Sequence, residues 1–388
     1  MYSNLVSTLG TRRRGVTFAF VTVTLVVMLG MASLTVDVGM MYRARAEAQA
    51  AADSAALAGA WKLLDRGDLA GAPDATDDIA AARTSSVLLA SRNDIVNDSV
   101  TVDGNHDVTV GYLADPTVVG APMTFGDPNL YNTVQVIVHR DEVRNGPIDL
   151  FFAGVFGQTE ADIQAEAWAT FKDGVVGFRP NDRTGNAGLM PLALHINAWR
   201  NLLSGAFTTG DNFSYNESTG VVAAGTDGIR ELNLYPGSGG SQLPPGNFGT
   251  VDFGGSGNST ADLARQIREG VSEADLAALG GELVLGSDGT LPLNGDTGLS
   301  GSIQNDLLSI LGQPRIIPLF NTVVSPGNNA TFTIVGFAGI RILDVQLTGA
   351  MSQKRVIVQP AFVVDDSSIT GSGSQNSSFV YFPVQLIR

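Results

Sequence analysis

The chain has 388 residues with 23 basic and 38 acidic side chains, so its formal net charge at neutral pH is −15. A field of that sign repels phosphate backbones, which argues against nucleic acid as a partner. There is no cysteine, which excludes a disulfide framework and a thiolate metal site.

An apolar segment near the N-terminus predicts a membrane-spanning helix. Arg12, Arg13 and Arg14 precede an uncharged run over residues 16–36, and Asp37 follows it. At ~1.5 Å per residue this run is about 31 Å long, enough to cross a hydrocarbon core of ~30 Å. The alternative, a cleavable signal peptide, usually has an apolar centre of only ~7–15 residues before a small-residue cleavage site. Because the run is longer and no convincing site follows it, we expect a retained anchor.

The basic cluster also predicts an orientation. Arg12, Arg13 and Arg14 are the only charges before Asp37, so the positive-inside bias places residues 1–15 in the cytoplasm. Residues 37–388 are then exported, and the lipid bilayer is the first expected partner.

The segment after the span, residues 37–66, predicts an alanine-rich helix. It contains no proline, and Asp65-Arg66-Gly67 provides a C-terminal stop. Small side chains recur along it and would let another helix approach closely: Ala44, Ala48, Ala51, Ala52, Ala55 and Ala58. Two interpretations stay open. The helix is a stalk, or it is a packing surface for a partner helix, including a homo-oligomer formed through this segment.

Residues 75–173 predict a small domain in which a helix packs on an antiparallel sheet. The expected elements are a helix over 79–91, a hairpin of strands 99–103 and 107–113, a strand over 134–139, a short helix or loop over 148–156, and a strand or helix over 161–171.

Residues 178–388 predict a β-rich region with short helices. Expected helices cover 193–203, 262–269, 272–279 and 302–311, and expected strands cover 315–320, 331–347, 355–364 and 379–387. Residues 235–257 are rich in glycine and proline, and predict a loop that is either a connector or a binding loop. The fold class is therefore α+β.

A search for catalytic and metal-binding patterns finds no support for an enzyme or a cofactor. No lysine follows a glycine in a phosphate-binding loop, no Gly-x-Ser-x-Gly elbow occurs, and His106, His139 and His195 are isolated. Asp365 and Asp366 begin a sequence near a metal-binding Asp-x-Ser-x-Ser pattern, but too few residues follow for that domain. We interpret it as a polar turn, and expect no catalytic, cofactor or metal site.

The N-terminal pattern resembles a known family. After the arginines and the span come Asp37, Gly39 and Tyr42, and then Gln49 and Asp53 followed by Ala55-Ala56-Leu57-Ala58. This order is similar to the N-terminal module of TadE/TadG-like Flp pilus-assembly proteins. Segments 132–139, 151–157 and 165–169 extend the resemblance to about residues 12–172.

One departure narrows that resemblance. Processed pilin-like relatives carry glutamate five residues after the glycine of the cleavage site, whereas Phe20 stands five residues after Gly15. This favours the anchored, TadG-like side of the family.

The resemblance implies a non-enzymatic, single-pass protein of the bacterial inner membrane. It would act in assembly or anchoring of Flp-type adhesive pili, with pilins or other pilus-assembly membrane proteins as partners. The alternatives are an anchored adhesin or carbohydrate-binding protein, and an anchored hydrolase.

Overall fold

A computed structural model describes residues 14–64, 69–70, 74–116, 118, 120–206, 210–235, 248–254, 259–324, 329–371 and 376–387. They group into two compact units. The first contains the chain up to Ala56 together with Ser86–Thr109 and Gln135–Ala167, and the second contains the remainder. The fold is α+β with a β-rich C-terminal region, as the sequence predicts.

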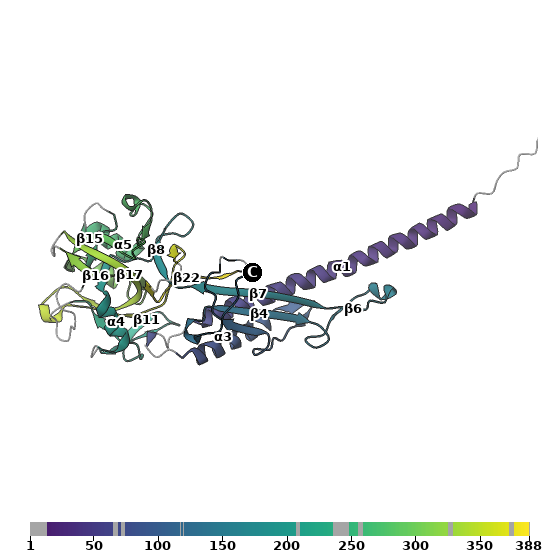
Figure 1. Ribbon diagram of the computed structural model, residues 1–388, viewed down its shortest axis with the longest axis horizontal. Coiled ribbons are helices and arrows are strands. Elements are labelled where there is room, and N and C mark those ends of the chain that lie inside the picture. The colour runs from purple at the N-terminus through teal and green to yellow at the C-terminus, as the bar shows by residue number, and fades with distance from the viewer. Residues whose placement is uncertain are drawn as a thin grey trace, which may run out of the picture. The chain divides into compact units, whose positions relative to one another are not determined.

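The N-terminal helix, α1, runs without a break over Arg14–Lys62 (Figure 1). The predicted span and the predicted alanine-rich segment are therefore one element of 49 residues. The basic residues Arg12 and Arg13 and the predicted stop at 65–67 lie outside the described residues.

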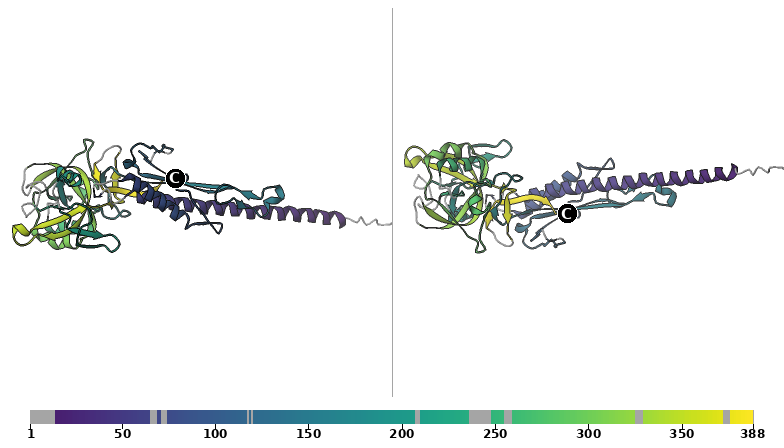
Figure 2. Two further views of the ribbon diagram at one scale, coloured as in Figure 1. Left: turned by 90° about the horizontal axis from the view of Figure 1, so that it is seen from below. Right: turned by 90° about the horizontal axis from the view of Figure 1, so that it is seen from above.

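The first unit combines α1 with parts of a sheet. Its elements include the end of α3 (Ala75–Ala90) and the strands β1 (Asp94–Ile95), β2 (Asp98–Ser99), β3 (Val108–Gly111), β4 (Thr133–Arg140), β5 (Ile148–Asp149), β6 (Glu160–Ala161) and β7 (Ile163–Lys172). Within this unit α1 runs alongside β4 and β7 (Figures 1 and 2). The predicted helix 79–91 and strand 134–139 are confirmed, and residues 161–171 form a strand.

The predicted hairpin of 99–103 and 107–113 is wrong in its first strand. Only β2 at Asp98–Ser99 is extended with a partner, and that partner is β1. Asn145 replaces the missing strand, since its side chain accepts from the Thr101 N–H at 2.9 Å and donates to the Thr101 carbonyl at 2.9 Å. The turn at 103–107 is held by the Asp107 carboxylate, which accepts from the Asp103 N–H.

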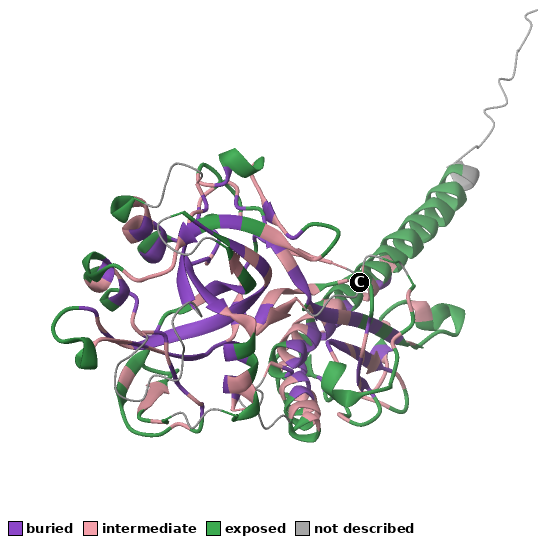
Figure 3. Ribbon diagram, turned by 60° about the vertical axis from the view of Figure 1, so that its left-hand side comes forward, coloured by how far each residue is buried: buried purple, intermediate pink, exposed green. Residues whose placement is uncertain are grey.

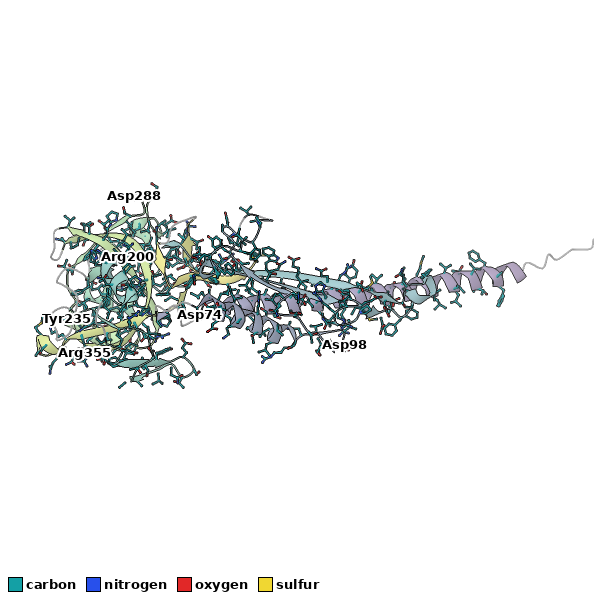
Figure 4. All side chains as sticks on the ribbon, turned by 60° about the horizontal axis from the view of Figure 1, so that its bottom comes forward. Asp74, Asp98, Arg200, Tyr235, Asp288 and Arg355 are labelled. Atoms are coloured by element: carbon teal, nitrogen blue, oxygen red, sulfur yellow. The ribbon has the colours of Figure 1, made fainter. Side chains whose placement is uncertain are left out.

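A buried arginine ties the β1–β2 turn to the sheet of the first unit. Arg140, at the end of β4, is 5% exposed and donates to the Ile95 carbonyl at 3.0 Å. It also contacts the Asp98 carboxylate at 3.2 Å (Asp98 is labelled in Figure 4). A charge this deeply buried is stable only because its donors are paired.

The second unit contains most of the remaining elements. Its helices are α4 (Ile196–Ser204), α5 (Thr260–Glu269) and α6 (Gln304–Leu308), with single 3₁₀ turns η1 (Pro128–Leu130), η3 (Ala277–Leu279), η4 (Gly301–Ile303) and η5 (Met351–Gln353). Its strands are β8 (Val175–Phe178), β9 (Leu192–His195), β10 (Phe213–Asn216), β11 (Val221–Ala224), β12 (Leu232–Asn233), β13 (Phe248–Val251), β14 (Leu283–Val284), β15 (Leu291–Asp296), β16 (Pro314–Val324), β17 (Ala330–Gln346), β18 (Arg355–Pro360), β19 (Val363–Val364), β20 (Ser368–Thr370), β21 (Ser377–Ser378) and β22 (Val380–Leu386).

Five of these strands close into a ring. Going round it, β9 pairs with β13, β13 with β15, β15 with β17, and β17 with β16, while β16 returns to β9 in parallel. The strands predicted over 315–320, 331–347 and 379–387 are confirmed as β16, β17 and β22. The strand predicted over 355–364 is instead two strands in different sheets, since β18 pairs with β17 and β19 pairs with β22. Helix 262–269 is confirmed as α5, which Ser259 caps at its start and Gly270 ends.

Three further predictions in this unit need correction. Residues 248–251, placed in a loop by their glycine-rich surroundings, form the buried strand β13. The predicted helix 193–203 begins late, because β9 continues to His195 and the His195 side chain then caps α4 by accepting from the Asn197 N–H at 3.1 Å. The predicted helix 272–279 is only a turn followed by η3.

Candidate membrane-boundary site

The described side chains of the apolar run in α1, residues 17–36, are exposed on the helix surface, except that Ser33 is half-buried. Exposed fractions along it include 76% for Phe18, 64% for Met28 and 50% for Leu34 (Figure 3, upper part of the long helix). Among the described residues this is the one helix long and apolar enough to cross a membrane. In water such a surface would be unfavourable, whereas a hydrocarbon core would cover it.

The polar groups of the span are satisfied within the helix itself. Four hydroxyls each donate to the carbonyl four residues earlier, at 2.6–2.9 Å: Thr22, Thr24, Ser33 and Thr35. Because lipid offers no hydrogen-bond partners, this arrangement suits a helix inside a bilayer.

Asp37 ends the apolar run and is nevertheless buried, with 2% of its surface exposed. Its carboxylate accepts three backbone N–H groups, from Phe151 at 2.9 Å, Phe152 at 2.9 Å and Ala153 at 2.6 Å. Three donors converging on one carboxylate offset the cost of removing the charge from water. We call this arrangement the Asp37 clasp.

The clasp holds the end of a narrow hairpin. Strands β5 and β6 pair through Ile148 with Ala161 and Asp149 with Glu160, and the 3₁₀ turn η2 (Ala153–Phe156) lies between them. Gly157 ends that turn with φ at 85°, a conformation that favours glycine. Residues 150–159, here called the hairpin tip, are thereby fixed against α1.

Gln49 and Asp53 of the family motif act together further along α1. The Gln49 amide donates to the Asp53 carboxylate at 2.8 Å and to the Glu166 carbonyl of β7 at 3.0 Å. Two residues before Gln49, the Glu47 carboxylate accepts from the Val96 N–H at 2.7 Å. Val96 has φ at 52°, which a β-branched residue rarely adopts, so this bond supports a strained turn.

The remaining motif positions divide between buried and open surface. Ala55 and Ala56 are fully buried, and Leu57 and Ala58 are half-buried. Gly39 has open space where a side chain would begin, and Tyr42 is 69% exposed. The structure thus brings Asp37, Gln49, Asp53 and the two alanines into packing contacts, and leaves Gly39 and Tyr42 outside them.

The alanine face of α1 is covered by this chain. Ala44, Ala48, Ala51, Ala52 and Ala55 are each at most 1% exposed. Neither sequence-based interpretation of this segment is therefore right: it is not an isolated stalk, and these five alanines are not open to a partner helix.

No group of three or more histidine, aspartate or glutamate side chains is placed to hold a metal ion within the described residues. The Asp365 carboxylate accepts from the Gly188 N–H at 2.6 Å and from the Ser367 N–H at 2.8 Å, which makes it part of a buried turn. The three histidines lie far apart in sequence and serve local contacts, such as His106 with Asp103 at 2.8 Å.

Sequence reasoning missed the hairpin tip. The sequence predicts only a short helix or loop over 148–156, and the family resemblance includes residues 151–157. Asp37 and residues 151–153 are more than a hundred positions apart in the sequence, and no local sequence pattern predicts their contact.

Comparison with protein families supports the interpretation of α1. Residues 15–62 match the model of a family described as "Putative Flp pilus-assembly TadE/G-like". The inferred resemblance is confirmed there, and stays an interpretation for residues 63–172. No curated protein and no solved structure matches the chain. This match supports a role in Flp/Tad pilus assembly, and the segment that carries it contains the candidate membrane span of the described residues.

Proposed function

We propose that this protein is a non-enzymatic anchor component that assembles or holds Flp-type pili at the bacterial inner membrane, with residues 37–388 exported. One observation carries the proposal. The segment that matches the TadE/G-like family coincides with α1, which joins an exposed apolar span to a face buried against the exported residues.

The two halves of α1 suit two tasks. Beyond Asp37 its alanine face is covered, so the helix is joined firmly to the first unit. Over residues 17–36 every side chain except the half-buried Ser33 is exposed, so lipid and partner helices compete for the same surface. We therefore assign contacts with other pilus-assembly membrane proteins, with pilins or with a second copy to residues 17–36 rather than to the alanine face.

The proposal is tested by deleting the gene and counting surface pili by electron microscopy. We expect strong loss of pili, restored by the wild-type gene. A second complementing gene replaces residues 17–36 with an unrelated leucine-rich span of equal length. If the native span makes specific contacts, this variant reaches the membrane but restores few pili.

Two outcomes separate the alternatives. Normal piliation in the deletion strain contradicts the assembly role, and normal piliation with lost surface attachment favours an anchored adhesin. Full rescue by the replaced span would limit the role of α1 to anchoring and would overturn our assignment of partner contacts.

A further inference from the structure

The hairpin tip presents apolar side chains to the outside. Exposed fractions are 71% for Phe151, 86% for Val155 and 75% for Phe156. Residues 150–159 contain no charged side chain, and the nearest charges, Asp149 and Glu160, face each other across the β5–β6 pair. Three large apolar groups at the end of one narrow hairpin are unusual on a surface that meets only water.

The tip lies at the end of the membrane span. The Asp37 clasp fixes Phe151–Ala153 at the level of the first charge after the apolar run. An open groove of about 670 Å³ between the two segments is lined by Leu34 and Val38 of α1 and by Leu150 and Ala153 of the tip. Leu34 belongs to the span, so the tip reaches the last turn of α1 that the bilayer covers.

We propose that the hairpin tip inserts into the exported-side interface of the bilayer that α1 crosses. Lipid is the occupant we commit to, because the apolar surface of the tip is continuous with that of the span at Leu34 and Val38. Aromatic side chains are also the groups that favour the interfacial layer, and Tyr42, which is 69% exposed, follows Asp37 by five residues on α1.

The surrounding charges set the depth of insertion. Glu142, Asp149, Glu160 and Asp162 are carboxylates near the base of the hairpin, and all of them are exposed. They are costly to move into hydrocarbon and are repelled by anionic lipid. Insertion therefore stops at the Asp149–Glu160 pair and is driven by apolar burial rather than by attraction between charges. The inference depends on α1 crossing the membrane, not on a role in pilus assembly.

The absence of cysteine makes a direct test possible. Four variants of the full chain each carry a single thiol for an environment-sensitive dye: Phe156→Cys, Val155→Cys, Leu88→Cys and Met28→Cys. The labelled proteins are reconstituted in vesicles of phosphatidylethanolamine and phosphatidylglycerol, with no pilus component present. Emission wavelength and quenching by iodide in water or by doxyl groups on lipid report depth.

Leu88 is the matched control for the tip. It is apolar and 48% exposed, and it lies on α3 near Asn93, whose side chain contacts Ser54 of α1 at 2.9 Å. Ser54 lies about 25 Å beyond Asp37 along the helix at ~1.5 Å per residue. Met28 marks the bilayer interior.

We expect dyes at Phe156 and Val155 to show blue-shifted emission, weak quenching by iodide and strong quenching by doxyl groups near the lipid headgroups. The dye at Leu88 should show the reverse. The double substitution Val155→Glu with Phe151→Glu should return a dye at Phe156 to the behaviour of Leu88. Equal quenching by iodide at Phe156 and Leu88 would overturn the proposal. Protection that occurs in native membranes but not in lipid vesicles would also overturn it, and would assign the tip to a protein partner.

Discussion

At the scale of single residues, Asp37 links the apolar span of α1 to the hairpin tip. A carboxylate that is 2% exposed and accepts three N–H groups contributes through all of those bonds at once. Asp37→Asn keeps the shape of the side chain but presents an NH₂ group to a donor. Because hydrogen bonds to a charged group contribute about 1.5–3 kcal/mol each, we expect a local loss of about 2 kcal/mol or more.

Hydrogen exchange of the full chain in detergent measures this loss. With ~1.4 kcal/mol per tenfold change, the amides of 151–153 should exchange about thirtyfold faster in Asp37→Asn. Asp149→Asn, which removes an exposed carboxylate from the same hairpin, is the control and should leave those amides unchanged. Unaltered exchange in Asp37→Asn would show that the clasp does not hold the tip.

At the scale of elements, the turn after α5 is fixed by Asp275. Its carboxylate accepts from the Ser272 N–H at 2.8 Å and from Arg265 at 3.0 Å, and the Ser272 hydroxyl accepts from the Asp275 N–H at 3.3 Å. The capping pattern read from Ser272 and Asp275 is thus present. It stabilises a turn and η3, because the Gly280-Gly281 pair, both at positive φ, ends the helical conformation.

Asp275 gives this turn a dependence on pH. Burial raises the pKa of its carboxyl, but the hydrogen bonds from Arg265 and Ser272 outweigh burial and leave the pKa below the ordinary 3.8. A lowered pKa in the folded state stabilises the fold above about pH 4 and ceases to do so as the pH falls through that lower value. Asp275→Asn should therefore cost about 2 kcal/mol at pH 7, with the difference from wild type shrinking as the pH falls below about 4.

Urea titrations of the full chain in detergent across that pH range, followed by tryptophan fluorescence, measure the difference. Glu273→Gln removes an equal charge from an exposed position in the same turn and should change little at any pH. A difference for Asp275→Asn that persists unchanged at the lowest pH would exclude titration of this carboxyl as its cause.

The closed ring of strands requires glycine where β13 meets β15. A Cβ built on Gly295 would lie 2.1 Å from the Thr250 carbonyl oxygen, and one on Gly249 would lie 2.4 Å from that of Asp296. Backbone atoms in a closed ring have little freedom to move, so Gly295→Ala should cost about 3 kcal/mol in the free energy of unfolding. Gly298→Ala, with nothing within 4 Å, is the control in the same segment. Urea midpoints that coincide for the two variants would contradict this account.

These elements also show how far sequence reasoning reaches. Helix α1 and strands β16 and β17 were predictable, because alanine content and alternating apolar residues act locally. Strand β13 was not, because its glycines are required by neighbours that only the folded ring provides. The prediction of a strand over 99–103 was wrong for a related reason, because the side chain of Asn145, which is distant in sequence, takes the place of a partner strand.

The same distinction applies to the candidate site. The resemblance to the family could identify Asp37, Gln49 and Asp53 as candidate site residues, because all three belong to a motif within one helical segment. Their partners in the 151–153 turn and at Glu166 could not, because tertiary contacts leave no periodic signature in either segment. The interpretation of the alanine face as a surface for a partner helix was wrong for the same reason. Small side chains allow close packing of either a helix or a sheet, so the sequence alone does not identify what covers them.

At the scale of the whole molecule, the sign of the charge changes at Asp37. Every charge before it is basic, whereas the chain as a whole carries −15, so the remainder is strongly acidic. A single helix of 49 residues crosses this boundary without a break. Its orientation therefore decides on which side of the membrane the acidic part of the chain lies.

We expect an N-terminus in the cytoplasm and residues 37–388 outside it, because Arg12, Arg13 and Arg14 resist transfer across the membrane. Single thiols test this in intact cells with a membrane-impermeant maleimide. Leu88→Cys and Val221→Cys, 48% and 55% exposed, should be labelled, whereas Ser3→Cys should react only after lysis. Replacing the three arginines with glutamine should yield a mixed population in which some chains expose Ser3→Cys to the reagent. Labelling of Ser3→Cys in intact cells with native arginines would reverse the orientation, and would place the hairpin tip against the cytoplasmic leaflet instead.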